Sequence, residues 1–202
     1  MDYADPRLRL QIDFILEIDR LKSVLRRTQL LHEPRRENSA EHSWHIAMAA
    51  VVLAEQADEP LDVGGALRML LIHDIVEIDA GDTYAYDERA RVDQPAREAQ
   101  AAARLFGLLP ADQARELYDL WDEFDRRATP EARFAHAVDR ILPLLHNFHT
   151  QGVAWQEHGV NADQVRARMR CIADSSAALS HLAESIIDAA VERGYLAAGP
   201  RP

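Results

Sequence analysis

Apolar residues recur at helical spacing along most of this chain, and no segment shows the alternation of apolar and polar residues that a half-buried strand requires. The first example covers residues 7–27, where the apolar positions lie three or four residues apart: Leu8, Ile12, Ile15, Ile18, Leu21 and Leu25. Helices of this kind bury one apolar stripe against other helices. The pattern therefore predicts an all-α fold.

Capping residues and prolines divide the rest of the chain into further helices. After a polar segment at 28–38, Ser39 is expected to cap a helix that runs through Ala57. Asp62 is expected to cap a third helix that ends near Glu77, and residues 79–83 are expected to form a loop. Later helices are expected to start at Pro95, Pro110, Thr129-Pro130 and Asn161, the last continuing to about Glu192.

No internal repeat and no low-complexity linker interrupts the 202 residues. A chain of this length suits one domain. We therefore expect a single domain over 1–202, with a core at about 10–160 and C-terminal helices at 161–195 packed on it.

Composition excludes several classes of function. A formal net charge of −11 repels a nucleic-acid backbone, so we expect no nucleic-acid polymer as partner. The longest strongly apolar run, from Ile46 to Ala54, is too short to span a bilayer, and the charged first twenty residues do not resemble a signal peptide. The single cysteine, Cys171, fits a reducing compartment. We expect a soluble, cytoplasmic protein.

Two imidazoles and two carboxylates on expected helices indicate a metal site: His42, His73, Asp74 and Asp139. Mixed nitrogen and oxygen ligands suit Mn, Fe, Co, Ni or Zn better than Ca. Taken singly, these residues have ordinary explanations, such as helix capping by His42 or an ion pair between Asp139 and Arg140. The apolar run before His73 predicts that the His-Asp pair is partly buried, and a buried pair needs a partner or a metal ion.

These residues also carry a family resemblance, which covers about residues 10–160. The motifs are Glu41-His42, His73-Asp74-Ile-Val-Glu77, Gly81-Asp82 and Phe134-Ala-His-Ala-Val-Asp139-Arg140. In this order they resemble the HD-domain phosphohydrolase superfamily, a family of helical bundles. The branch they resemble contains bacterial 5′-deoxynucleotidases and hydrolases related to HD-domain-containing protein 2.

The resemblance implies a role for each matching position. His42, His73, Asp74 and Asp139 would bind one divalent metal ion (Mn, Co, Mg, Fe, Ni or Zn), which would polarise the phosphate and activate water. The expected catalytic residues are Glu77, for the attacking water or proton transfer, and Asp82, for the sugar or the water. Arg27 matches an arginine that orients the substrate phosphate, with Arg26 as its rival. Relatives also suggest a homodimer.

One position departs from the family pattern. Thr28 stands where the bacterial deoxynucleotidases have a tryptophan that helps exclude a 2′-hydroxyl. Selectivity for deoxyribose over ribose is therefore not implied for this chain.

Local charge fits a phosphate substrate. Residues 20–36 contain six basic residues and one acidic residue, Glu33: Arg20, Lys22, Arg26, Arg27, Arg35 and Arg36. Within an acidic chain, such a basic island suits a small phosphorylated substrate.

The sequence thus favours a metal-dependent phosphomonoesterase acting on small phosphorylated metabolites, foremost nucleoside 5′-monophosphates. Three alternatives remain: hydrolysis of another phosphate ester or a nucleotide polyphosphate, a metal-binding helical module without turnover, and a di-iron oxygenase. The last is disfavoured because two-metal relatives supply additional histidines, and only His136 lies between Asp74 and Asp139.

Overall fold

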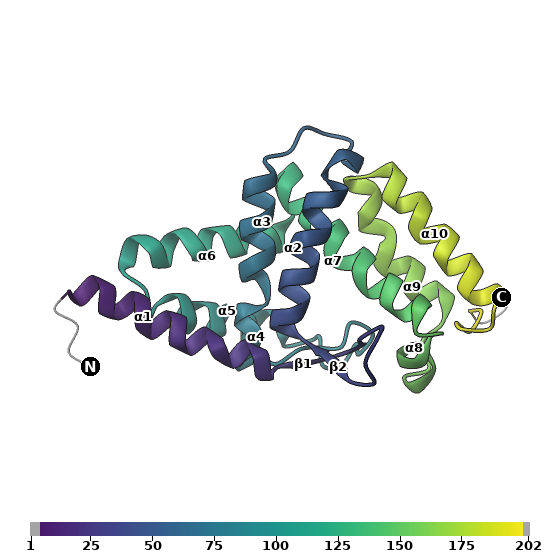
Figure 1. The fold of residues 1–202 in the computed structure, drawn as a ribbon, viewed down its shortest axis with the longest axis horizontal. Helices are drawn as coiled ribbons and strands as arrows, with labels where there is room; N and C mark the ends of the chain where they lie inside the picture. The colour runs from purple at the N-terminus through teal and green to yellow at the C-terminus, as the bar shows by residue number, and fades with distance from the viewer. Residues whose placement is uncertain (1–4, 200–202) are drawn as a thin grey trace.

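Residues 5–199 are described by the computed structural model, and nearly all of the regular structure among them is helical (Figure 1). The α-helices are α1 (Pro6–Ile18), α2 (Ser39–Leu53), α3 (Val63–Ile72), α4 (Glu77–Ala80), α5 (Gln94–Phe106), α6 (Ala111–Arg126), α7 (Pro130–His149), α8 (Val153–Glu157), α9 (Ala162–Met169) and α10 (Ala177–Glu192). Short 3-10 turns are η1 (Asp19–Ser23), η2 (Ala54–Gln56), η3 (His73–Val76) and η4 (Arg170–Asp174). The all-α prediction is confirmed.

One part of that prediction is wrong, because a two-stranded antiparallel ribbon lies inside the segment expected to contain no strand. Its strands are β1 (Leu25–Gln29) and β2 (Arg36–Asn38), paired from Leu25↔Asn38 to Gln29↔Arg36 with one irregularity between. The helix expected over 7–27 accordingly ends at Ile18, and η1 leads into β1. Apolar spacing continued through Leu25, but the strand gains ladder hydrogen bonds from residues 7 to 13 positions further along the chain.

The N-cap of helix α2 lies one residue earlier than expected. Asn38, rather than Ser39, is the N-cap, and it forms a reciprocal capping box with Glu41, with hydrogen bonds of 2.9 and 3.1 Å. This frees the Ser39 hydroxyl for another partner. The caps expected at Thr129 and Asn161 are confirmed, each side chain accepting a hydrogen bond from the third residue of its helix.

The expected third helix does not run uniformly to Glu77. α3 ends at Ile72, η3 carries His73 and Asp74, and α4 continues from Glu77 to Ala80, so that the loop begins at Gly81, whose φ of 75° ends the helix. None of the helices among residues 5–199 is long and apolar enough to cross a membrane.

The turn η3 lies between two hydrophobic clusters. The larger surrounds α7 and includes Met69 and Leu70 from α3, together with residues of α2, α9 and α10. The smaller lies among α1, α5 and α6 and includes Ile72, Ile75 and Val76. In Figure 1, α1, α5 and α6 lie at one end of the molecule and α9 and α10 at the other, with α2, α3 and α7 between them. The turn with the His-Asp pair therefore has a buried core on both sides.

Candidate metal centre and active site

The structure brings together all four residues expected to bind metal. His42 comes from α2, His73 and Asp74 from η3, and Asp139 from α7, and each side chain is buried. His42 Nε2 lies 2.9 Å from Asp139 Oδ1, and His73 Nε2 lies 2.9 Å from Asp74 Oδ1 and 3.8 Å from Asp139 Oδ1. His42, His73 and Asp139 each offer a donor atom within 4.8 Å of the other two. Such a donor set could hold one transition-metal ion.

The orientation of His73 fits this use. Its Nδ1 lies 2.9 Å from the carbonyl oxygen of Leu70, which can only accept, so Nδ1 carries the hydrogen. Nε2 then presents a lone pair toward two carboxylates and has no hydrogen-bond partner within residues 5–199. A lone pair 2.9 Å from a carboxylate oxygen is repulsive unless a proton or a metal ion lies close to both. A backbone carbonyl that fixes the tautomer is also common for metal-binding histidines.

Neighbouring groups stabilise the ionised forms of Asp74 and Asp139. Burial opposes ionisation of Asp74, but His73 and the Arg26 guanidinium outweigh it and lower the pKa of Asp74 to about 2. Burial likewise opposes ionisation of Asp139, whereas Arg140 and the hydrogen bond to His42 lower the pKa of Asp139. Both groups are therefore carboxylates at neutral pH.

Glu77 and Asp82, the expected catalytic residues, lie beside these ligands. Glu77 Oε2 accepts a 2.6 Å hydrogen bond from the Ser39 hydroxyl, which the cap at Asn38 leaves free. Burial and the nearby Asp74 charge raise the pKa of Glu77 well above that of an ordinary glutamate. Burial also raises the pKa of Asp82, with a further contribution from Asp74 that Arg26 opposes. A carboxyl group with a raised pKa is suited to exchange a proton near neutral pH.

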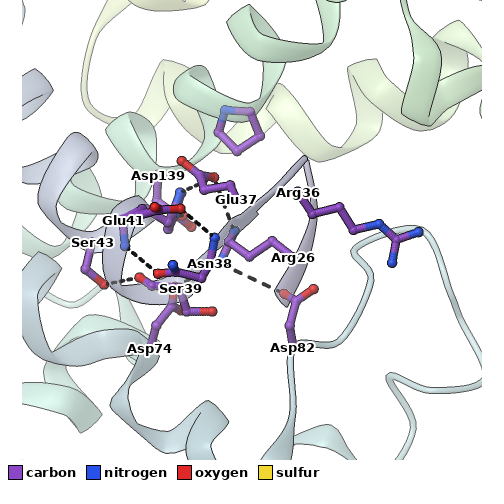
Figure 2. Close-up of polar contacts among 12 residues, drawn as sticks. Arg26, Arg36, Glu37, Asn38, Ser39, Glu41, Ser43, Asp74, Asp82 and Asp139 are labelled. Carbon is purple, nitrogen blue, oxygen red and sulfur yellow. Dashed lines mark hydrogen bonds and ion pairs between the residues drawn. The ribbon is translucent and has the colours of Figure 1, made fainter. Parts of the chain in front are cut away.

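Arg26 on β1 points into the carboxylate cluster (Figure 2). Its Nη1 donates a 2.8 Å hydrogen bond to Asp74 Oδ2 and lies 3.9 Å from oxygens of Glu77 and Asp82. Arg27, the next residue, is exposed on the strand but also lines the cavity in front of the metal ligands. Side chains of consecutive strand residues point to opposite faces, so Arg26 and Arg27 point in different directions.

The basic island at 20–36 does not act as one patch. Arg20 pairs with Glu17, Lys22 with Asp19, and Arg35 with both Glu33 and Glu41. Arg36 points away from the carboxylate cluster in Figure 2. Only Arg26 and Arg27 of the island line the cavity.

Sequence reasoning missed the roles of Glu37 and Ser39 in the site, whereas it did offer the ion pair between Asp139 and Arg140. Glu37 is 1% exposed, and its Oε2 lies 3.4 Å from His42 Nδ1, so a carboxylate stands behind this histidine. Arg140 Nη1 donates a 2.9 Å hydrogen bond to Asp139 Oδ2, and Ser39 donates to Glu77. The sequence shows that Glu37 precedes the N-cap of α2. The direction of its side chain, however, depends on the pairing of β1 with β2.

A second group of donor atoms lies on the far side of His42. Glu37, His45 and His146 come from β2, α2 and α7 and bring one atom each within 4.8 Å of one another. These residues could also hold a cation.

Known proteins resemble this chain over most of its length. The family model described as "HD domain" matches residues 18–179. The bovine and human proteins named "5'-deoxynucleotidase HDDC2" are 31% and 29% identical to it over 66% and 68% of this chain. The chain spans less than two thirds of these relatives, at 64% and 66% of their length.

Solved structures extend the similarity. A crystal structure described as a "Predicted metal-dependent phosphohydrolase" from Magnetospirillum magnetotacticum MS-1 has 54% identity and a TM-score of 0.92, covering 97% of this chain and 98% of that one. The PH0347 protein from Pyrococcus horikoshii OT3, at 23% identity and a TM-score of 0.60, covers 90% of this chain and 99% of its own and shares the fold.

Proposed function

This chain belongs to the HD domain family, and on that premise we propose that it is a metal-dependent phosphohydrolase of small phosphorylated metabolites, foremost nucleoside 5′-monophosphates. Relatives named 5′-deoxynucleotidases support the substrate class. The proposal depends mainly on one observation. His42, His73 and Asp139 form a buried set of metal-donor atoms beside a cavity that Glu77 and Arg26 also line.

His42, His73, Asp74 and Asp139 would hold one divalent ion. The unpaired Nε2 of His73 and the two ionised aspartates fit such an ion, and the mixed ligands suit Mn, Fe, Co, Ni or Zn better than Ca. When bound, the ion supplies Lewis acidity, which polarises the phosphate and lowers the pKa of water.

The surrounding side chains would divide the remaining work. Glu77, with its raised pKa, would accept the proton of the attacking water through one carboxylate oxygen while Ser39 holds the other. Arg26 would neutralise the substrate phosphate, since its guanidinium lies among Asp74, Glu77 and Asp82 and can exchange a carboxylate for a phosphate oxygen. Arg27 and Asp82 would contact the substrate from the cavity wall.

Phosphate release from a panel of ribo- and deoxyribonucleoside 5′-monophosphates tests the proposal, with Mn, Co or Mg supplied. We expect release from several of them and only weak preference for deoxyribose. The small buried side chain of Thr28 lines the cavity, and it stands where the bacterial deoxynucleotidases have a tryptophan that helps exclude a 2′-hydroxyl. A metal-loaded protein that releases phosphate from none of the panel contradicts the proposal.

Metal affinity is expected to rise with pH and then level off. Burial and Arg26 oppose the charged ring, but hydrogen bonds to Asp139 and Glu37 outweigh them and raise the pKa of His42 above its usual 6.5. Below that raised pKa the ring binds a proton, which the metal must displace, so the affinity falls by about tenfold per pH unit for one proton. Calorimetric titration with Mn between pH 5.5 and 8 measures the slope. His149→Gln, at an exposed site, should not change it, and a flat profile in the wild type would refute the assignment.

We also propose a homodimer in a reducing, cytoplasmic setting, the latter supported by the single cysteine. An exposed apolar stripe on α2 supports the dimer: Trp44, Met48, Val51 and Val52 are 64%, 46%, 49% and 67% exposed. Stripes of this kind mark interfaces.

A Met48→Glu/Val52→Glu double variant is expected to sediment as a monomer, because two charges cannot be buried unpaired in an apolar interface. Val92→Glu, at a valine that is 83% exposed outside the stripe, is the matched control and should leave the mass unchanged. Analytical ultracentrifugation gives the mass. Wild-type protein that is monomeric at high micromolar concentration excludes the dimer.

A further inference from the structure

A second cavity opens beside the metal centre and is rich in arginine. It shares Ala85, Tyr86, Arg140 and Arg168 with the cavity in front of the metal ligands. We name it the arginine groove after five of its lining residues: Arg91, Arg127, Arg140, Arg168 and Arg170. Two carboxylates, Glu88 and Asp174, line it as well. A net positive groove in a chain of net charge −11 is a local feature that a small anion would recognise.

Separate parts of the fold build this groove. Arg140 lies on α7, Arg168 on α9 and Arg170 at the start of η4, whereas Arg127 caps the end of α6 and Arg91 precedes α5. Segments that are distant in sequence thus place like charges together. Their mutual repulsion costs free energy unless an anion offsets it.

Most of these arginines have no carboxylate partner among the residues that the structure describes. Within residues 5–199, Arg91, Arg127, Arg168 and Arg170 form no ion pair. Arg166, on the same helix as Arg168, behaves differently and pairs with both Glu184 and Asp188. Arg166 is therefore neutralised by carboxylates of α10, whereas Arg168 forms no ion pair with Glu88 or Asp174, the two carboxylates that line the groove.

Arg168 is the central member because it lines both cavities and is half-buried. Burial and the charge of Arg140 lower the pKa of Arg168 to about 9. A desolvated guanidinium beside another cation gains more from a bound anion than one in water does. Guanidinium groups also match phosphate oxygens in a bidentate geometry.

The groove starts at the metal centre. Arg140 donates to Asp139 Oδ2 at 2.9 Å, so one residue touches both an expected metal ligand and the groove. A substrate whose scissile phosphate lies among the metal ligands and Arg26 would extend past Tyr86, which lines both cavities, toward Arg168.

We propose that the arginine groove binds a second phosphate group of the substrate, and that the protein prefers nucleotides carrying such a group over simple monophosphates. This proposal rests on the proposed function for the scissile phosphate. The second group can be attached at the sugar 3′-position, as in a nucleoside 3′,5′-bisphosphate, or belong to the linkage of a 5′-phosphorylated dinucleotide.

The test compares kcat/KM for adenosine 5′-monophosphate, adenosine 3′,5′-bisphosphate and a 5′-phosphorylated adenosine dinucleotide. We expect at least one two-phosphate substrate to exceed the monophosphate by about tenfold or more, the scale of one charge-assisted hydrogen bond. Arg168→Gln should abolish that preference, and Arg170→Gln, at the exposed end, should reduce it. Arg166→Gln, on the same helix but paired outside the groove, should retain it. The two-phosphate substrate that is preferred identifies the source of the second phosphate.

Binding separates this proposal from the proposed function. Calorimetry with adenosine 3′,5′-bisphosphate should show tighter binding than with the monophosphate, and Arg168→Gln should remove the difference while circular dichroism stays unchanged. If the preference in binding persists but no substrate is hydrolysed, the groove is supported and the phosphohydrolase proposal fails. If monophosphates are hydrolysed, but two-phosphate substrates gain nothing and Arg168→Gln changes no ratio, the groove proposal is overturned.

Discussion

Asp74→Asn is expected to lower kcat for nucleoside monophosphate hydrolysis by at least about 1000-fold, equivalent to about 4 kcal/mol of transition-state stabilisation. Asp74 lies within 2.9 Å of His73 Nε2 and within 2.8 Å of the Arg26 guanidinium. His73 and Arg26 lower the pKa of Asp74 despite its burial, so it is ionised at neutral pH. An amide of the same shape cannot supply that charge to a cation, so the metal content should fall together with the rate.

The measurement pairs phosphate release with elemental analysis of the dialysed protein. Asp79→Asn is the matched control, since Asp79 lies five residues further on and pairs with Arg104 outside the cavity. That variant should retain both the metal and the rate within about twofold, as is usual for an exposed ion pair. A fully active Asp74→Asn protein with normal metal content would remove Asp74 from the ligand set.

Glu77→Gln is expected to lower kcat by about 100- to 10,000-fold, the range for loss of a general acid or base, while metal content stays at the wild-type value. Glutamine retains a hydrogen-bond acceptor for Ser39, but it cannot take a proton. A loss of rate with unchanged metal content would indicate that Glu77 transfers a proton, whereas a loss of both would indicate that it binds the metal. Activity of the wild type should also fall as the pH drops through the raised pKa of Glu77, because the carboxylate form is the base.

Glu116→Gln serves as the control for this second substitution, because Glu116 pairs with Arg68 on the surface and lies outside the cavity. A steady-state pH profile with a saturating nucleotide gives kcat for all three proteins. Equal kcat values for wild type and Glu77→Gln would show that the proton goes elsewhere, and Asp82 would be the next group to replace.

The sequence predicted the fold class and the family because both depend on local signals. Helical spacing, the cap at Asn161 and the Thr129-Pro130 start are properties of neighbouring residues, and the structure confirms them. The family assignment depended on His42, His73-Asp74 and Asp139 in order, and the family model confirms it. Once each of these four residues was placed on a helix, their convergence could be expected. Their roles remain predictions.

Other features depend on contacts that a single sequence does not reveal. The ribbon of β1 and β2 was missed because its ladder joins residues across a turn, and without it the direction of Arg26 could not be separated from that of Arg27. Glu37 reaches His42 for the same reason. Arg168 lies 94 positions after Asp74 in the sequence and lines the same cavity because α9 packs against α7.

The position of η3 between the two hydrophobic clusters has a consequence for heat inactivation. Leu70 belongs to one cluster and Ile72, Ile75 and Val76 to the other, so loosening either half of the molecule displaces His73 and Asp74. Unfolding of either cluster is therefore expected to stop catalysis. On gradual warming, turnover should therefore be lost no later than the near-ultraviolet dichroism of the tryptophans in whichever half unfolds first.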